Sequence, residues 1–334
     1  MDKRIGFIGT GEIAAIHAES IRRMGVGLVV AGGCDIRKNS AESFCGRYGG
    51  RVYDSAQSLI EDKDIDTVYI CTRHDSHIQI SLASLEAGKS IFLEKPLAMN
   101  GNDAKMFLKE YQKKPVPMAV GFNMRVSPAT SRFKDLMRDY SVNPESFRAN
   151  MTAAPFMGGW ASDPAAGGGV LVCLGSHMFD LITHLLGSPI KRICASVQHI
   201  SQPHTKEGDS ATILLELENG VCGTLLLHDR GTREFHVEPE GRMTNITVYS
   251  QQGTFDLDAY GRVRYATKKG FVEEIPSGGR DQCHSWGYEQ ENIEFLKLLN
   301  GTKTELCTIE QAVRVTAAVD AARSSDSTKC WAEV

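Results

Sequence analysis

The chain has 334 residues, too many for one small core, and this length predicts about two domains. Hydrophobic residues make up 42% of it and charged residues 23%, which is ordinary globular composition and argues against disorder. The formal net charge of −4 gives no reason to expect nucleic acid or an anionic membrane as a partner.

The start of the chain leads directly into a strand pattern, without an apolar segment and cleavage site, so we expect no secretory signal. We find no run of about 18 apolar residues and expect no transmembrane helix. Nine cysteines occur without CxxC spacing, and several lie in apolar, strand-like runs where a reduced cysteine acts as a small hydrophobe. These features predict a reducing, cytoplasmic location and no structural zinc site.

Strand and helix signals alternate from the start of the chain to residue 121. Strands are predicted at 4–8, 28–34, 67–72, 90–93 and 118–121, with helices at 12–24, 40–48, 77–87 and 102–112. Some strands are apolar throughout, which is typical of strands buried on both faces of a parallel sheet. The pattern predicts an α/β domain over residues 1–122, a doubly wound Rossmann sheet of right-handed βαβ units.

The second half of the chain has a different pattern. Helices are predicted at 129–139 and 169–186, flanking a strand, and two more at 285–299 and 308–323. Between them, longer strands are predicted at 190–200, 210–218, 221–228, 243–249, 253–258 and 262–267. Asn219-Gly220 predicts a hairpin, because both residues tolerate a positive φ. We therefore expect residues 123–334 to form an α/β domain with a large open, mostly antiparallel sheet.

The turn after the first strand reads G-x-G-x-x-A and opens a helix. Its residues are Gly9, Thr10, Gly11, Glu12, Ile13 and Ala14. Gly9 would allow the tight turn, Gly11 would let a pyrophosphate approach the backbone, and Ala14 would let the helix pack closely on the strand. The helix N-terminus offers free N–H groups to phosphates. The segment predicts a dinucleotide site.

Asp35, at the end of the second strand, strengthens this prediction. A carboxylate there can accept hydrogen bonds from the adenosine ribose and repels a 2′-phosphate, so NAD is favoured as the cofactor over NADP. Arg37 and Lys38 follow at once and would neutralise a 2′-phosphate if they folded inward, which keeps NADP open. Otherwise they belong to a solvated loop. We count Arg37 among the candidate cofactor residues.

Two later segments resemble the Gfo/Idh/MocA oxidoreductases. They are FLEKPLA at 92–98, which matches the family's E-K-P-L-A, and GGGVLVCLGSHMFD at 167–180, which matches its G-G-G-x-L-x-D-x-G-x-H-x-x-D. Weaker matches occur in the family's order at 72–77, 87–89, 121–125 and 160–164. The resemblance implies a Rossmann domain joined to an open-sheet domain that often assembles dimers or tetramers. It also implies oxidation of a ring hydroxyl of a sugar, sugar derivative or cyclitol.

Lys95 and His177 are the candidate catalytic residues. Lys95 lies just beyond the fourth strand, where ligands of an open α/β sheet collect, and its ammonium could stabilise an alkoxide and exchange protons. The plainer alternative is a surface lysine. His177 lies in an apolar helical stretch and could be a core residue, but the motif favours a general base or substrate ligand. Asp180, at i+3, could orient the imidazole or anchor an ion pair.

Cys173 departs from the family pattern, which has Asp four positions before the histidine. A thiol is mostly neutral at pH 7 and cannot replace a carboxylate that holds an imidazolium, unless Lys95 depresses its pKa. Either Lys95 and His177 suffice, or the reaction tolerates a neutral residue, or the protein binds without catalysis. We keep Cys173 and Asp180 as candidate site residues.

The resemblance also implies further contacts. Arg125 and Trp160 would line a sugar pocket, and His284 and Trp286 could close it. His77 should begin a helix and pack under the loop before it, and the Lys95–Pro96 bond is often cis in the family. The implied cofactor-binding residues are Thr72, Arg73, His74, His77, Glu94, Lys95 and Asn123. The spacing of the histidines predicts no metal site.

The sequence thus predicts an NAD(P)-dependent dehydrogenase that acts on a small sugar or cyclitol. We expect a homodimer or homotetramer through the second sheet, with no nucleic acid and no membrane as partner. Two alternatives stay open. One is a glycoside-cleaving or epimerising enzyme that oxidises its substrate transiently, and the other is a non-catalytic NAD-binding regulator.

Overall fold

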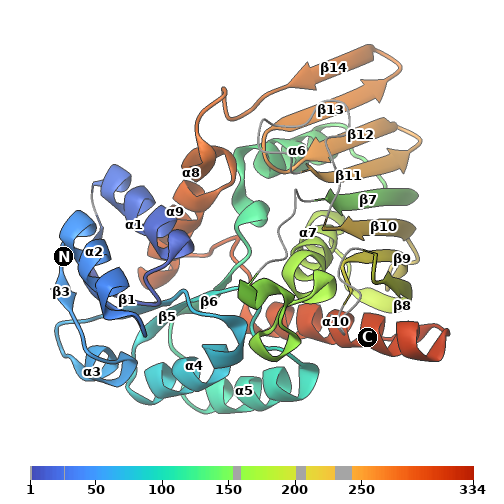
Figure 1. Ribbon diagram of the computed structural model, residues 1–334. Helices are drawn as coiled ribbons and strands as arrows, with labels where there is room; N and C mark the ends of the chain where they lie inside the picture. The colour runs from blue at the N-terminus through green and yellow to red at the C-terminus, as the bar shows by residue number, and fades with distance from the viewer. Residues whose placement is uncertain (1, 26, 153–158, 201–207, 230–242) are drawn as a thin grey trace. The chain divides into compact units, whose positions relative to one another are not determined.

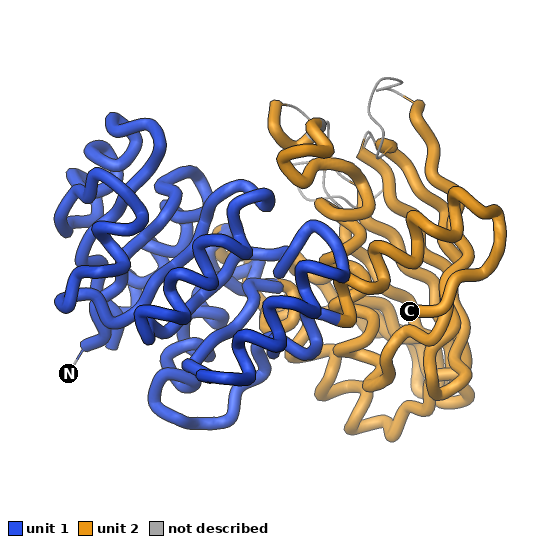
Figure 2. The backbone as a smooth tube through the Cα atoms, turned by 90° about the horizontal axis from the view of Figure 1, so that it is seen from below, with its two compact units in different colours: residues 1–123, 282–313 blue, residues 124–281, 314–334 orange. Residues whose placement is uncertain are grey.

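Figure 1 shows the computed structural model, which describes residues 2–25, 27–152, 159–200, 208–229 and 243–334. The chain folds into two compact units, which Figure 2 distinguishes by colour. The first comprises Met1–Asn123 and Gln282–Val313, and the second comprises Met124–Asp281 and Arg314–Val334. The segment 282–313 thus folds with the first unit, and the domain boundary expected at residue 122 stays a prediction.

The first unit contains a six-stranded parallel sheet with the strand order β3-β2-β1-β4-β5-β6. Its strands are β1 (Lys3–Ile8), β2 (Leu28–Cys34), β3 (Arg51–Val52), β4 (Thr67–Ile70), β5 (Ser90–Glu94) and β6 (Met118–Gly121). The order reverses between β1 and β4, which is the switch point where doubly wound sheets bind ligands. The predicted Rossmann sheet is confirmed.

Seven α-helices belong to the described part of the first unit. They are α1 (Glu12–Met24), α2 (Lys38–Tyr48), α3 (Ala56–Glu61), α4 (His77–Glu86), α5 (Gly101–Lys113), α8 (Gln282–Ser285) and α9 (Tyr288–Leu299). The helix predicted over 285–299 is confirmed as α9, which starts three residues later because Gly287, with φ +93°, separates it from α8. The sequence failed to predict α3, whose six residues are held by a capping box between Ser55 and Ser58.

The second unit contains a nine-stranded sheet with the order β14-β13-β12-β11-β7-β10-β9-β8-β15. Its strands are β7 (Ser146–Thr152), β8 (Ile190–Gln198), β9 (Ser210–Leu217), β10 (Cys222–His228), β11 (Met243–Ser250), β12 (Gly253–Asp258), β13 (Arg262–Thr267), β14 (Gly270–Glu274) and β15 (Ala332–Glu333). Among the described strand pairs of this sheet, only β7–β10 is parallel. The mostly antiparallel sheet is confirmed, with β14 and β15 as additions.

Helices cover one face of this sheet. In Figure 1, α6 (Pro128–Asp139) and α7 (Ser176–Leu186) lie along the same side of its strands, whereas α10 (Ile309–Thr328) runs below β8. Alternate residues of β10 follow this division, since Leu225 and Leu227 are fully buried whereas Leu226 is 39% exposed. The opposite face of the sheet therefore presents apolar side chains to its surroundings.

One apolar stretch, Pro164–Leu186, is long and apolar enough to cross a membrane, with a mean hydropathy of 1.5. Ser176, His177, Asp180, Thr183 and His184 interrupt it, so it is not an unbroken apolar run. Because 78% of its most apolar window is buried inside the protein, it behaves as a core segment and gives no evidence of a membrane.

Candidate active site

The dinucleotide turn follows β1 directly. Gly9 has φ +82°, and a Cβ there would lie 2.5 Å from the carbonyl oxygen of Cys71, so this position requires glycine. Gly11 begins α1 without a side-chain cap, and a Cβ there would meet no atom within 4 Å. The first N–H groups of α1, from Glu12 and Ile13, have no carbonyl partner within the helix and no side-chain cap, as an anion site requires.

Asp35, which follows β2, is tied to this turn. Its Oδ2 accepts hydrogen bonds from the N–H (2.9 Å) and the hydroxyl (3.3 Å) of Thr10, and its Oδ1 accepts from the Arg37 N–H at 2.9 Å. The Arg37 guanidinium lies 3.8 Å from Oδ1 with its side chain 75% exposed. The anionic carboxylate is thus fixed beside the phosphate turn. These residues fit NAD, whose ribose hydroxyls can donate to the carboxylate.

A cleft of about 450 Å³ opens beside the same turn. Thr10, Gly11 and Glu12 line it from one side, and residues of α2, from Asn39 to Tyr48, line it from the other. The turn is therefore accessible to a ligand within the first unit.

Lys95 shares its edge of the sheet with the dinucleotide turn. It follows β5, whereas Thr72 follows β4 and Asn123 follows β6, and the carboxyl ends of parallel strands lie on one edge. The Lys95 N–H donates to Glu94 Oε2 at 3.2 Å, and the Lys95–Pro96 bond is cis, as the resemblance implies. The structure therefore brings the candidate lysine to the ligand edge of the Rossmann sheet.

His77 links the loops that follow β4 and β5. It begins α4 and is fully buried, with Nδ1 2.7 Å from the Pro96 carbonyl oxygen and Nε2 3.2 Å from that of Thr72. Burial lowers its pKa below the usual range, so the ring is neutral at pH 7. The prediction that His77 begins the helix and packs under the loop is confirmed. This contact fixes the chain around Lys95.

The other candidate cofactor residues near these loops have protein partners. Arg73 pairs with Asp75 at 2.9 Å, and His74 is buried in the short helix η1 (His74–Ser76). The side-chain amide of Asn123 donates to the backbone oxygen of Trp286 at 2.9 Å. Asn123 thus anchors the segment that enters α9.

His177 is the second residue of α7 in the second unit and is half-buried. It follows a glycine turn in which Gly169 has φ +109°, and a Cβ on Gly168 would lie 2.3 Å from the Ala161 oxygen. The helix predicted over roughly 169–186 is confirmed, but its first part, η5 (Leu171–Gly175), is wound as a π-helix before α7 begins. A hydrophobic pattern does not distinguish these windings, and π-turns often occur at functional sites.

Cys173 lies in the middle of this π-turn. The residue is 2% exposed, and its thiol donates a weak hydrogen bond to the Gly167 oxygen at 3.9 Å. A cysteine thiol is mostly neutral at pH 7, whereas an aspartate side chain would be charged. This position therefore adds no negative charge to the helix that carries His177.

Asp180 and Arg125 form a buried, bidentate ion pair. Arg125 Nε and Nη2 lie 2.7 and 2.6 Å from the two oxygens of Asp180, and the side chains are 3% and 1% exposed. Both carboxylate oxygens are therefore used by the guanidinium, which matches the alternative of an ion-pair anchor. Trp160, on the short helix η3 (Gly159–Ser162), is 40% exposed and keeps its ring accessible.

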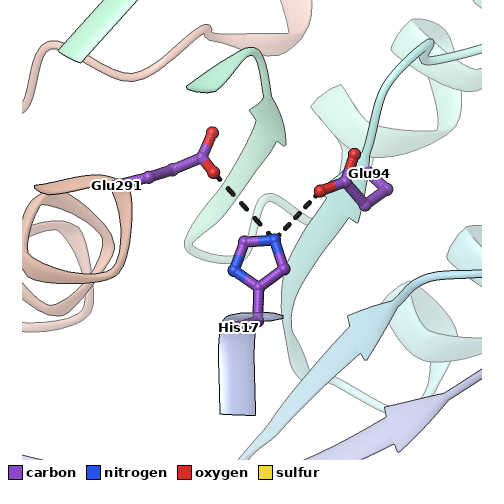
Figure 3. Close-up of side chains that lie close together, drawn as sticks. All are labelled: His17, Glu94 and Glu291. Carbon is purple, nitrogen blue, oxygen red and sulfur yellow. Dashed lines mark hydrogen bonds and ion pairs between the residues drawn. The ribbon is translucent and has the colours of Figure 1, made fainter. Parts of the chain in front are cut away.

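Sequence reasoning missed a cluster behind Lys95. His17 on α1 and Glu291 on α9 are buried beside Glu94 at the end of β5, as Figure 3 shows. The available signal was a histidine in the apolar pattern of the dinucleotide helix, together with a glutamate in that of α9. Neither of these residues alone indicates a buried cluster.

Comparison with known proteins gives consistent relatives. The chain is 26% identical over 307 residues to myo-inositol 2-dehydrogenase of Thermotoga maritima, covering 82% of this chain and 89% of that protein. It is 28% identical to D-glucoside 3-dehydrogenase of Escherichia coli, covering 68% of each. Levoglucosan dehydrogenase, solved with NADH and levoglucosan, has the same fold with a TM-score of 0.90 at 19% identity, over 100% of this chain and 99% of that one.

Two family models divide the chain between them. The oxidoreductase family with an NAD-binding Rossmann fold matches residues 3–122, and the C-terminal alpha/beta domain of the same family matches residues 137–334. Together they account for most of the sequence and both sheets. The chain therefore belongs to the Gfo/Idh/MocA family of NAD-binding oxidoreductases.

Proposed function

We propose that this NAD-dependent oxidoreductase transfers hydride between a ring hydroxyl of a sugar, sugar derivative or cyclitol and the nicotinamide. The observation that carries the proposal is the position of Lys95 on the same sheet edge as the dinucleotide turn of Gly9 and Gly11. The relatives that act on inositol, glucosides and levoglucosan support this substrate class.

Bound NAD supplies the hydride acceptor, so the protein must supply orientation, proton transfer and charge. We assign the Lys95 ammonium to the oxygen of the reacting hydroxyl, where it stabilises negative charge as the proton leaves. His177 takes that proton as the general base. In the reverse direction, His177 returns the proton to the oxygen, which Lys95 again contacts.

Other residues bind the sugar. We assign the Arg125 guanidinium, which Asp180 holds in place, to the binding of substrate oxygens. The exposed ring of Trp160 offers an apolar face to a sugar ring. Cys173 adds a neutral thiol, so the binding site has no carboxylate at that position.

The direct test is reduction of NAD by purified protein with a panel of inositols, free sugars, glycosides and anhydrosugars. At least one should give NADH, and Lys95→Ala should abolish the reaction while the exposed Lys105→Ala leaves it unchanged. If protein that binds NAD reduces it with none of them, the dehydrogenase is refuted. Cleavage or epimerisation without net NADH, with nucleotide retained on the protein, would identify the transient-oxidation alternative.

We also propose assembly through the open face of the nine-stranded sheet. Leu214 and Leu226 there are 45% and 39% exposed on neighbouring strands, which is typical of a surface covered by a second copy. Light scattering should give a dimer or tetramer that Leu226→Asp dissociates; a wild-type monomer would refute this.

We also propose that the protein is cytoplasmic, which cell fractionation tests. We propose that its two domains are residues 1–122 and 123–334.

A further inference from the structure

The two edges of the nine-stranded sheet differ in how the chain covers them. At one edge the two-residue strand β15 pairs with β8. Further along β8, the N–H groups of Ala195 and Val197 donate to side chains of α10, Ser325 Oγ and Asp326 Oδ1, both at 2.9 Å. The chain itself thus satisfies this edge, which is how proteins keep an edge strand from pairing with other molecules.

The opposite edge is β14, which Figure 1 shows as the outermost strand. Among the described strands it pairs with β13 alone. Phe271 is 68% exposed and Val272 is 38% exposed. Because successive residues of a strand face opposite sides of the sheet, apolar side chains are accessible on both sides of this strand. An exposed apolar edge of this kind is where a further strand can add to a sheet.

The sequence of this edge is complementary to itself. The segment 268–274 reads KKGFVEE, with two lysines before and two glutamates after the central Phe271. In an antiparallel pair of two such segments centred on Phe271, the two aromatic rings lie opposite each other. Lys269 then lies opposite Glu273, and the outer lysine lies opposite the outer glutamate. Aromatic pairs and opposite charges are the cross-strand pairs that stabilise a sheet.

The nearest alternative registers lose this match. Registers centred on Gly270 or Val272 also keep every side chain on its own face of the sheet. The first places Phe271 opposite Lys269, and the second places Phe271 opposite Glu273. Each sets an exposed ring against a charge and separates the lysines from the glutamates. The charge pattern therefore favours the register centred on Phe271.

The charged groups of the central pairs are accessible. Lys269 is exposed, and Glu273 keeps 40% of its side chain exposed with only a long contact of 3.8 Å to Arg262. Glu274 is instead held by Arg132, whose Nε and Nη2 lie 2.7 and 2.9 Å from its two oxygens. The pair of Lys269 with Glu273 therefore carries most of the charge recognition.

We propose that β14 pairs antiparallel with β14 of a second copy of this chain, centred on Phe271, so that two sheets join edge to edge. The contact has two-fold symmetry, as most homo-oligomeric contacts do. It is separate from the proposed assembly through the open face and does not rest on it. Either contact alone gives a dimer, and both together give a tetramer. Because β14 has five residues, the edge contact is small and its affinity modest.

Exchange of charges tests the pairing by sedimentation velocity of the whole protein. Lys269→Glu should raise the Kd of the edge contact roughly tenfold or more, because carboxylates then face each other twice across the two-fold axis. Glu273→Lys should weaken it likewise, and Lys269→Glu/Glu273→Lys should restore it. The exposed Lys303→Glu, in the first unit, changes the net charge equally and should have no effect. Association that survives both single reversals, or that the double variant fails to restore, would overturn the proposal.

A disulfide tests the register. Opposite residues of an antiparallel pair have Cβ atoms about 4.5–5.5 Å apart, so Phe271→Cys should form a disulfide-linked dimer under mild oxidation. Ile275→Cys, 55% exposed just beyond the strand, is the control and should give no more linked dimer than the wild type. The wild type sets the background, because Cys222 and Cys330 are exposed. Linkage in Phe271→Cys at or below that background would contradict the register.

Leu226→Asp separates the edge contact from the open face. A tetramer that either Leu226→Asp or Lys269→Glu reduces to dimers, and that both reduce to monomers, supports both contacts. A dimer that only Lys269→Glu splits supports the edge contact and refutes the open-face assembly. A dimer that only Leu226→Asp splits does the reverse, and a monomer at every concentration overturns both.

Discussion

Removing the Asp180 carboxylate should strongly destabilise the second unit. Its two hydrogen bonds to Arg125, of 2.6 and 2.7 Å, hold a guanidinium that is only 3% exposed. Asp180→Ala leaves that cation buried without its carboxylate, and breaking a buried pair in this way costs about 3–5 kcal/mol. For a unit of this size each kcal/mol lowers the melting temperature by about 2–4 °C, so we expect a fall of roughly 6–20 °C.

The double variant Arg125→Met/Asp180→Leu provides the internal control. It removes both charges and fills the space with apolar atoms, so it should recover most of the lost stability, since such replacements of buried pairs are often close to neutral. Calorimetry of the three proteins at one pH and salt concentration gives the comparison. The reasoning is refuted if Asp180→Ala melts with the wild type, or if the double variant is less stable than Asp180→Ala.

Three further predictions concern other described residues. Burial lowers the pKa of His184 to about 3. The imidazole of the folded protein therefore stays neutral at pH values where that of the unfolded chain is protonated. The free energy of unfolding should fall as the pH drops from about 6.5 toward 3, by at most about 1.4 kcal/mol per pH unit. Denaturant titrations of His184→Gln should show a flatter pH dependence, and an unchanged slope would contradict the assignment. Gly11→Ala should melt like the wild type, because its Cβ meets no atom within 4 Å, yet weaken NADH binding roughly tenfold or more in a fluorescence titration. Asp35→Ser keeps an acceptor for Thr10 but removes the charge, so the preference for NAD over NADP should drop roughly tenfold in paired Kd measurements; a constant ratio would show that the carboxylate does not select the cofactor.

The sequence predicted those features that local patterns determine. The buried parallel strands are unbroken apolar runs, and the dinucleotide turn depends on the backbone freedom of Gly9, which sequence spacing alone reveals. Elements held by few residues escaped prediction, as α3 and the two-residue strand β3 show. The π-turn at Leu171–Gly175 escaped because an apolar run has no periodicity that separates it from an α-helix.

The partners of the site residues were less predictable than the residues themselves. Asp180 is 55 positions from Arg125, and His17 is 275 positions from Asn292, so no local rule connects either pair. These contacts form because tertiary packing brings distant helical segments together. Each buried polar group must then form a hydrogen bond or ion pair with a neighbouring group. Chemistry at a site can be read from motifs, whereas its electrostatics requires the fold.

The cysteine at position 173, where the family has aspartate, changes the charge available near His177. The thiol donates to a carbonyl oxygen and is neutral, and the Asp180 carboxylate is occupied by Arg125, so neither residue offers an anion to a protonated His177. In the proposed reaction, the imidazolium formed when His177 takes the substrate proton is then less stabilised than beside a carboxylate. More of the work of holding negative charge on the reacting oxygen falls to Lys95. A lysine with that task must be held in place, and the contacts of Glu94 and His77 on either side of Lys95 and Pro96 do this from within the Rossmann unit.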